Sequence, residues 1–501
     1  MTDAETPQAE EPGGQPSQRD PLPPSARPLL KWTVVVLVFL LVVAGAGLTA
    51  VLLLRNASSA TSDGWPAEVS PFVDFVEKER DLEFTEPVPV EFLPVAEFRK
   101  EVQSEKGELT QQDRKEIKQT TGLLRAVGLI EGELDLFDAV NDLAGAGVLG
   151  YYSHEDEMIR IRGEDLTPAS KATLVHELTH ALQDQHFDLG ARMDAFERAD
   201  DKGEDTGEQT AFEALVEGDA SRIESAYRDS LSEEEVDALQ EEERGTSARY
   251  TKETRDIPEI LTTMVGAPYA LGEVMLELAI EIDGDDAVDT LFAEPPTTDE
   301  HLLDPWTLIA DHDIALEVPE PDLAPGERKF DVGRFGALMW LFVLAERIPL
   351  DQALDAADGW DGDAYVGFER GGDTCVRVRY RGETARDRTQ MQRALTHWRA
   401  AMPGSTASVD RVGRDLDFES CDPGATAEVG TDSSSDALGL ALMRTRIAVG
   451  LVGGPGDRET TRCYADRLVH AFTINQLTDP DFDADRPAVQ RTMRDLFLSC
   501  Q

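Results

Sequence analysis

Positive charge is scarce in this chain of 501 residues, which has 47 lysine and arginine residues against 99 aspartate and glutamate residues. The formal net charge at pH 7 is therefore −52. A surface of this sign repels the phosphates of nucleic acids and the anionic headgroups of lipids. The composition thus argues against nucleic acid as a partner, and it suits a protein that stays soluble outside a cell or in high salt.

Cysteine is also rare, and all four cysteines lie late in the chain, at positions 375, 421, 463 and 500. No two are spaced as Cys-x-x-Cys, which argues against a zinc site made of cysteines. An even number in an extracellular segment favours disulfides, for which three pairings exist. We expect Cys375–Cys421, which would join two strands, and Cys463–Cys500, which would join helices near the C-terminus. Pairing across these two units is the alternative.

Long apolar runs are absent except for Trp32–Leu54, a run of 23 residues without a charged side chain. This length is sufficient to cross a bilayer. The run lacks the short apolar core and small-residue exit site of a cleavable signal peptide. Arg27 and Lys31 precede it and acidic residues soon follow it, so the positive-inside rule places the N-terminus in the cytoplasm. We expect a single-pass protein of the cell membrane whose larger, C-terminal part is extracellular.

Composition divides the chain into five parts. The first residues are rich in Pro, Gly, Gln and Glu, which cannot bury a core, and a small polar segment after the apolar run is typical of a tether. A late cluster of Pro, Gly and Ser marks a further boundary. The expected parts are a disordered cytoplasmic tail (1–31), a transmembrane signal anchor (32–54), a linker (55–68), an α+β catalytic domain (69–422) and a helical C-terminal domain (431–501).

Histidine is rare too, with 8 residues, yet two of them occur in the pentad His-Glu-Leu-Thr-His that begins at His176. The pentad lies in the helical run Thr167–Gly190. His176 and His180 are four residues apart, so both imidazoles lie on one face of a helix and can reach a single metal ion. Glu177 is offset from that face and can serve as general base towards a zinc-activated water. The alternative is a chance occurrence of the pattern in an ordinary helix.

The pentad does not fix the third metal ligand, and three residues compete for this role. His186 has the spacing of metzincins, but that arrangement needs the chain to leave the helix near Gln183, where the residues favour helix. The other two residues, Glu213 and Glu217, lie one turn apart in the next helical stretch, Glu208–Asp229. An acidic pair on one face is costly to bury without a cation.

With the pentad followed by Glu-Gly-Asp-Ala, the sequence resembles gluzincin-type zinc metallopeptidases, which carry an HExxH…EGxA pattern. It also resembles uncharacterised bacterial membrane-anchored proteins with this motif. In that pattern the Glu before the Gly is the third ligand, which implies that Glu217 ligates and that Glu213 stands behind it. A thermolysin-like alignment exchanges the roles of Glu213 and Glu217. The gap from His180 to either glutamate is, however, longer here than in thermolysin-like enzymes. Gly218, next to Glu217, would let a second backbone approach closely.

The resemblance implies a zincin-like catalytic domain, with a small edge sheet beside the active-site helix. Residues 148–153 and 158–163 are expected to form two strands joined by a polar turn. Such a hairpin borders the cleft in this family, and its edge strand can pair with an extended substrate. The resemblance also covers two later segments, which contain Tyr269 and His301. Whether either residue stabilises the oxyanion of the reaction is an open question at this point.

Two functions from different classes follow from these patterns. The first is a membrane-anchored zinc metallopeptidase with one zinc ion per chain, in which Glu177 activates the water that attacks a peptide bond of a protein or peptide substrate. The second is a zinc-binding protein of the cell surface that binds or scaffolds without proteolysis.

Overall fold

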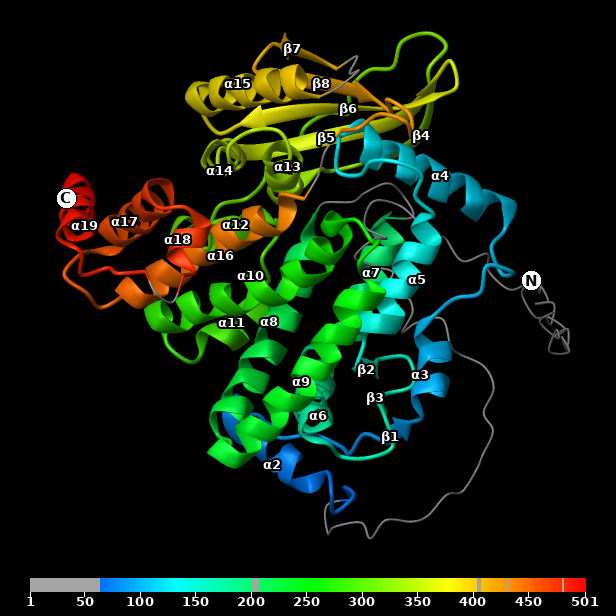
Figure 1. The fold of residues 1–501 in the computed structure, drawn as a ribbon, viewed down its shortest axis with the longest axis vertical. Helices are drawn as coiled ribbons and strands as arrows, with labels where there is room; N and C mark the ends of the chain where they lie inside the picture. The colour runs from blue at the N-terminus through cyan, green and yellow to red at the C-terminus, as the bar shows by residue number, and fades with distance from the viewer. Residues whose placement is uncertain (1–63, 201–206, 403–406, 430–431, 480–481) are drawn as a thin grey trace, which may run out of the picture.

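The computed structural model has a mixture of helices and strands, which confirms the predicted α+β class. The expected tail, the apolar anchor Trp32–Leu54 and the linker up to residue 63 lie outside the described residues. The ribbon in Figure 1 shows helices at the centre, a small sheet at one end and a larger sheet at the other. The described residues are 64–200, 207–402, 407–429, 432–479 and 482–501.

The first half of the described chain builds the small sheet and the central helices. The helix with the pentad, α6, follows directly on the hairpin of β2 and β3, as the sequence predicts. The elements in order are α2 (Ser70–Arg80), β1 (Val90–Leu93), α3 (Val95–Val102), α4 (Gln111–Ala126), α5 (Leu136–Gly147), β2 (Gly150–Ser153), β3 (Met158–Arg162), α6 (Pro168–Phe187), α7 (Leu189–Asp200), α8 (Glu208–Asp229), α9 (Glu233–Glu253) and α10 (Glu259–Asp283).

The second half adds the larger sheet and the C-terminal helices. It begins with short helical segments that lead out of α10. The elements are α11 (Ala287–Ala293), α12 (Glu300–Leu303), a π-helical turn η1 (Thr307–Asp311), β4 (Arg328–Gly333), α13 (Gly336–Ala345), α14 (Leu350–Ala357), β5 (Trp360–Arg370), β6 (Asp373–Gly382), α15 (Ala385–Ala401), β7 (Ser408–Val412), β8 (Asp415–Cys421), α16 (Ser434–Leu451), α17 (Arg458–Ala471), α18 (Ile474–Leu477) and α19 (Pro487–Ser499).

The small sheet has the strand order β1-β3-β2, with β1 parallel and β2 antiparallel to β3. Alternate residues of β3 are buried, and Ile159 and Ile161 pack in one apolar cluster with Leu174 and Leu178 of α6. This contact holds α6 against the sheet. Among the described strands β2 pairs with β3 alone, so its other edge is available to an extended chain.

The helices α8 and α10 cross with their backbones in contact at Gly218 and Gly272. A Cβ atom on Gly272 would lie 1.8 Å from the carbonyl oxygen of Ala214, and one on Gly218 would lie 2.3 Å from the carbonyl carbon of Gly272. Only glycine permits this approach, as the sequence predicts for Gly218. Among the described residues, α10 is the one helix long and apolar enough to cross a membrane, yet most of its apolar stretch is buried inside the protein.

The larger sheet is antiparallel with the strand order β4-β5-β6-β8-β7. Side chains alternate between its two faces. On the inner face, Val376 and Val378 of β6 and Phe418 of β8 are fully buried in the main core. Trp340 of α13 and Trp398 of α15 both contact the ring of Phe418. This face joins the sheet to the helices beside it.

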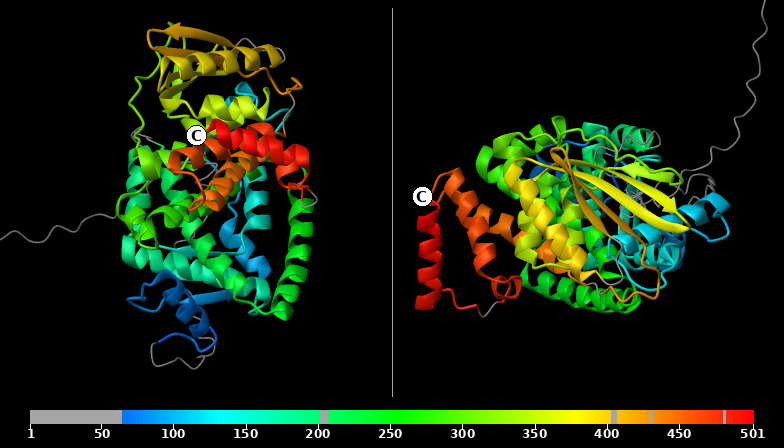
Figure 2. Two further views of the ribbon diagram at one scale, coloured as in Figure 1. Left: turned by 90° about the vertical axis from the view of Figure 1, so that its left-hand side faces the viewer. Right: turned by 90° about the horizontal axis from the view of Figure 1, so that it is seen from above.

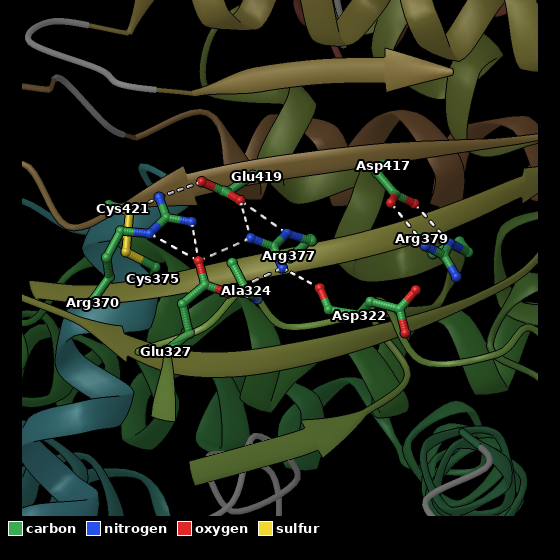
Figure 3. Close-up of polar contacts among 10 residues, drawn as sticks. All are labelled: Asp322, Ala324, Glu327, Arg370, Cys375, Arg377, Arg379, Asp417, Glu419 and Cys421. Carbon is green, nitrogen blue, oxygen red and sulfur yellow. Dashed lines mark hydrogen bonds and ion pairs between the residues drawn. A yellow bond between two sulfur atoms is a disulfide. The ribbon is translucent and has the colours of Figure 1, made fainter. Parts of the chain in front are cut away.

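The outer face of the larger sheet carries a row of arginines on β6 (Figure 3), whose Nε atoms donate to acidic side chains of β8 at 2.8 to 2.9 Å. Each arginine also donates to a backbone carbonyl of residues 316–322, an extended segment called the strap from here on. The sheet therefore holds the strap by its arginines. The sets are Arg377 with Glu419 and Asp322, Arg379 with Asp417 and Glu320, and Arg381 with Asp415 and Glu317.

Both disulfides that the sequence predicts are present. Cys375 and Cys421 lie opposite each other on β6 and β8, and Cys463 of α17 is joined to Cys500 at the end of α19. The C-terminal helices are partly built into the main core, because Ala437 of α16 is buried there and α16 packs along α10. The pair α17 and α19 projects outward from this core, as Figure 2 shows.

The contact between α8 and α10 gives a prediction for stability. Gly218→Ala should destabilise the protein by about 2–3 kcal/mol or more, because the added methyl group meets backbone that cannot move aside. Chemical denaturation of the variant measures this loss. Gly245→Ala on α9 is the control: nothing lies within 4 Å of its added methyl group. That control should be stabilised by about 0.5–1 kcal/mol. Equal effects of the two changes would contradict the close crossing.

Candidate metal centre

The helix with the pentad begins where the sequence predicts and ends slightly earlier. The side chain of Thr167 accepts a hydrogen bond from the backbone N–H of Ser170, so it caps α6 as expected. The helix ends at Asp188, which adopts a left-handed conformation with φ 54°. Gly190, the expected end, already belongs to α7.

The alternative ligand His186 remains on the same unbroken helix. Its Nε2 atom lies 2.8 Å from the backbone oxygen of Glu83, away from the face that carries the first two histidines. No break occurs after His180, and this break is what the metzincin arrangement would need. The structure therefore does not bring His186 to the pair.

The structure does bring His176, His180 and Glu217 together. The Nε2 atoms of His176 and His180 lie 3.2 and 3.3 Å from the same oxygen, Oε2 of Glu217. Ligand atoms of all three residues lie within 4.8 Å of one another. The two histidines come from α6 and the glutamate from α8, helices that pack side by side (Figure 1). Three donors thus converge on one point.

The far nitrogen of each imidazole faces an acceptor. Nδ1 of His176 lies 3.2 Å from Oε2 of Glu224, and Nδ1 of His180 lies 3.0 Å from Oε1 of Gln183. The amide of Gln183 is oriented, because its Nε2 donates to the backbone oxygen of Val216. Its oxygen must then accept, so Nδ1 of His180 carries the proton. Nε2 of His180 is therefore the ring nitrogen left to bind a metal ion, and Nε2 of His176 faces the same oxygen of Glu217.

A buried carboxylate stands behind Gln183. Asp219 is fully buried and accepts from Nε2 of Gln183 at 3.0 Å. Arg80 of α2 and Arg222 of α8 also donate to it, at 2.8 and 2.9 Å. Arg80 itself is only 6% exposed and also reaches Asp289. A connected set of polar contacts therefore holds the ring of His180 from behind.

Glu177 lies beside the three donors, against the edge strand of the small sheet. Its side chain is buried and packs close to Gly150 of β2. Burial raises the pKa of Glu177 above its usual value, although both histidines oppose this shift. The carboxylate also lines a cavity of about 460 Å³, shared with His176, His180 and Glu217.

Glu213, the competing ligand, stands one turn away and outside the group of three. Its Oε1 accepts from Nε2 of Gln209 at 2.7 Å, and its Oε2 has no hydrogen-bond partner among the described residues. Burial raises the pKa of Glu213 to about 8, with a smaller contribution from the charge of Glu217. Of the two glutamates, the structure brings only Glu217 to the histidines.

The two oxyanion candidates lie in different places. Tyr269 of α10 lines the cavity, and its ring stacks on that of His176 with centroids 6.0 Å apart. Burial raises the pKa of Tyr269 well above its usual value, so its hydroxyl keeps its proton. His301 lies elsewhere: it is buried in α12, its Nδ1 is 2.8 Å from Oγ1 of Thr307, and it does not line the cavity. The structure thus removes His301 from consideration and leaves Tyr269 at the site.

The charges at the centre fit a divalent cation. Burial by itself lowers the pKa of His176, but the carboxylates of Glu217 and Glu224 raise it well above its usual value. Burial raises the pKa of Glu217, yet the two imidazoles hold it well below its usual value. Five glutamates line the cavity, beside three imidazoles and one arginine. Two imidazoles and a carboxylate are also a ligand set that catalytic zinc sites use, with one position left open.

Sequence reasoning missed Glu224 and Gln183. Glu224 lies seven residues after Glu217, so two helical turns bring it to the same face of α8, and this spacing was visible in the sequence. Gln183 lies three residues after His180 and was considered only as a position where the helix might break. A projection of each helix that shows which residues share its metal-binding face would have indicated both as partners of the histidines.

No protein-family model, curated protein or solved structure matches this chain. What the centre does is therefore inferred from its own residues.

Replacement of the two competing glutamates separates their roles. Glu217→Gln should lower the affinity for zinc by more than about 100-fold, because it removes a charged ligand. Glu213→Gln, the same chemical change one turn away, should leave the affinity within about threefold, since this side chain does not reach the histidines. Isothermal titration of zinc into metal-free protein measures both values. The reverse order would assign the ligand to Glu213.

The contact behind His176 gives a second metal-binding prediction. Glu224→Ala should lower the zinc affinity by about 10- to 100-fold, because the ring of His176 loses the acceptor that orients it. The exposed Glu234→Ala on α9 serves as control and should change nothing. Titration of both variants with zinc checks this, and an unchanged affinity in Glu224→Ala would show that the contact is not needed for binding.

Proposed function

We propose that this chain is a zinc-dependent metallopeptidase with a zincin-like catalytic domain. The observation that supports this most is the convergence of two imidazole Nε2 atoms and the Glu217 carboxylate beside a buried Glu177, at the wall of a cavity. His176, His180 and Glu217 would hold the metal ion. Zinc bound there would supply a Lewis acid, which polarises a carbonyl group and makes water more acidic.

Glu177 is the general base and acid in this proposal. A carboxylate whose pKa is raised by burial is a better acceptor for a proton near neutral pH than an exposed one. Packing against Gly150 of the edge strand holds this side chain in place. Glu177 then takes a proton from water and passes it to the leaving amine of the cleaved peptide bond.

The substrate in this proposal is an extended peptide that pairs with β2. Residues 149–152 line the cavity directly beside Glu177, and β2 is an edge strand. Main-chain hydrogen bonds along such an edge bind a peptide independently of most of its side chains. In this proposal the hydroxyl of Tyr269, which keeps its proton, would donate to the oxygen of the scissile carbonyl. Trp32–Leu54 would anchor the enzyme so that it acts outside the cell membrane.

The decisive test replaces the general base. Glu177→Gln should retain stoichiometric zinc but lower kcat by about 10²- to 10⁴-fold, because the amide cannot take the proton. A broad peptide library with cleavage followed by mass spectrometry measures activity, and metal analysis measures zinc. The matched control is Glu155→Gln, the same change in the exposed turn between β2 and β3.

Each outcome of this test has a clear meaning. Full activity in Glu177→Gln would remove the residue from the mechanism. A wild-type protein that holds zinc and cleaves no peptide in the library would instead favour the non-proteolytic surface protein.

A further inference from the structure

Three acidic residues that are distant in sequence meet outside the cavity that His176 and His180 line. Glu300 belongs to α12, Asp313 follows the π-helical turn η1, and Glu383 lies in the turn between β6 and α15. One carboxylate oxygen from each lies within 4.8 Å of the other two. Two oxygens bound to the same calcium ion lie at most about 5 Å apart, since each bond is about 2.3–2.6 Å long. The spacing therefore suits three ligands of one ion.

Glu300 is the residue that indicates a ligand. Its side chain points into this group although the residue is only 2% exposed, and its Oε1 atom has no hydrogen-bond partner among the described residues. A buried carboxylate oxygen without a donor is costly. Burial raises the pKa of Glu300 to about 9, and the neighbouring charges of Glu383 and Asp313 add to this shift.

The neighbouring carboxylates, in contrast, have their own donors. Asp299 accepts from the backbone N–H groups of Ala337 and Leu338 at 2.9 and 3.1 Å. Asp304 accepts from Arg462. Glu300 has no such partner at Oε1, so local hydrogen bonding does not explain why a carboxylate is buried there.

Nearby basic side chains do not supply the donor that Oε1 of Glu300 lacks. Arg462 uses its donors on Asp304 and Asp311. His301 is bonded to Thr307, and burial lowers the pKa of its imidazole to about 4, so it carries no charge at neutral pH. Within the described parts of the chain, no basic side chain forms an ion pair with any of these three carboxylates.

We propose that Glu300, Asp313 and Glu383 bind a calcium ion, at a site separate from the histidine-containing centre. The donors are carboxylate oxygens alone, which hard cations prefer, and a mixture of buried and exposed ligands leaves room for the waters and carbonyls that complete six to eight positions around calcium. Zinc would instead favour sites with nitrogen or sulfur donors.

The calcium ion has a structural role in this inference. Asp313 lies three residues before the strap begins, and Glu383 directly follows β6, whose arginines hold the strap. Glu300 stands on the helical side, next to Asp299, which binds the N-terminus of α13. A bound ion would therefore fasten the start of the strap to the sheet and to the helices at once.

A calcium titration of the full-length, zinc-loaded protein in detergent tests the site. Saturating CaCl2 should raise Tm by about 3 °C. Glu300→Gln should abolish this increase, because the amide removes the buried charge while it keeps the shape. Should that variant fail to fold, Glu383→Gln at the exposed edge of the group provides the same test. Glu320→Gln in the strap should keep the full increase.

Several results would overturn the inference. These are the absence of a saturable increase in the wild type, an equal increase in Glu300→Gln, or an equal increase with choline chloride, which would indicate general screening of the acidic surface. An equal increase with MgCl2 would reject calcium as the preferred ion. Because peptidase activity is not the readout, failure of this test and failure of the metallopeptidase proposal are distinguishable.

Discussion

The buried contact between Glu217 and the two imidazoles of α6 is the constraint on which the rest of the molecule depends. Removal of one partner from a buried ionic group typically costs about 3–5 kcal/mol, so α8 must present the Glu217 face to α6. Successive residues of a helix point about 100° apart. Once Glu217 faces α6, Gly218 faces the next helix, and there α10 packs against it. Two consecutive residues thus supply the candidate ligand Glu217 and the close helix crossing at Gly218.

The polar groups behind the centre form a connected path through several helices. His180 contacts Gln183, Gln183 contacts Asp219, and Asp219 is held by Arg80, which also reaches Asp289. Such networks gain strength in a low-dielectric interior when each member is satisfied. The orientation of the ring is therefore specified by α2, α8 and α11 together, and not by the rotamer preference of one side chain.

Local patterns in the sequence predicted a good part of this structure. The cap at Thr167, the hairpin before α6 and both disulfides follow from residue types and spacing, and all are present. The choice between Glu213 and Glu217 depends on the rotation of α8 about its axis, which a helical repeat does not set. Glu300 lies far in sequence from Glu383, so only the folded chain reveals that they meet. The zincin-like fold and the membrane anchor remain predictions.

The guanidinium of Arg80 has a practical consequence for work on this protein. It is the last residue of α2, the first described helix, and it reaches the buried Asp219 behind the metal centre. A fragment that begins after this helix would remove one of the two arginines that pair with the buried Asp219, next to the amide that orients His180. Any shortened protein that omits the apolar run Trp32–Leu54 therefore has to start upstream of Ser70.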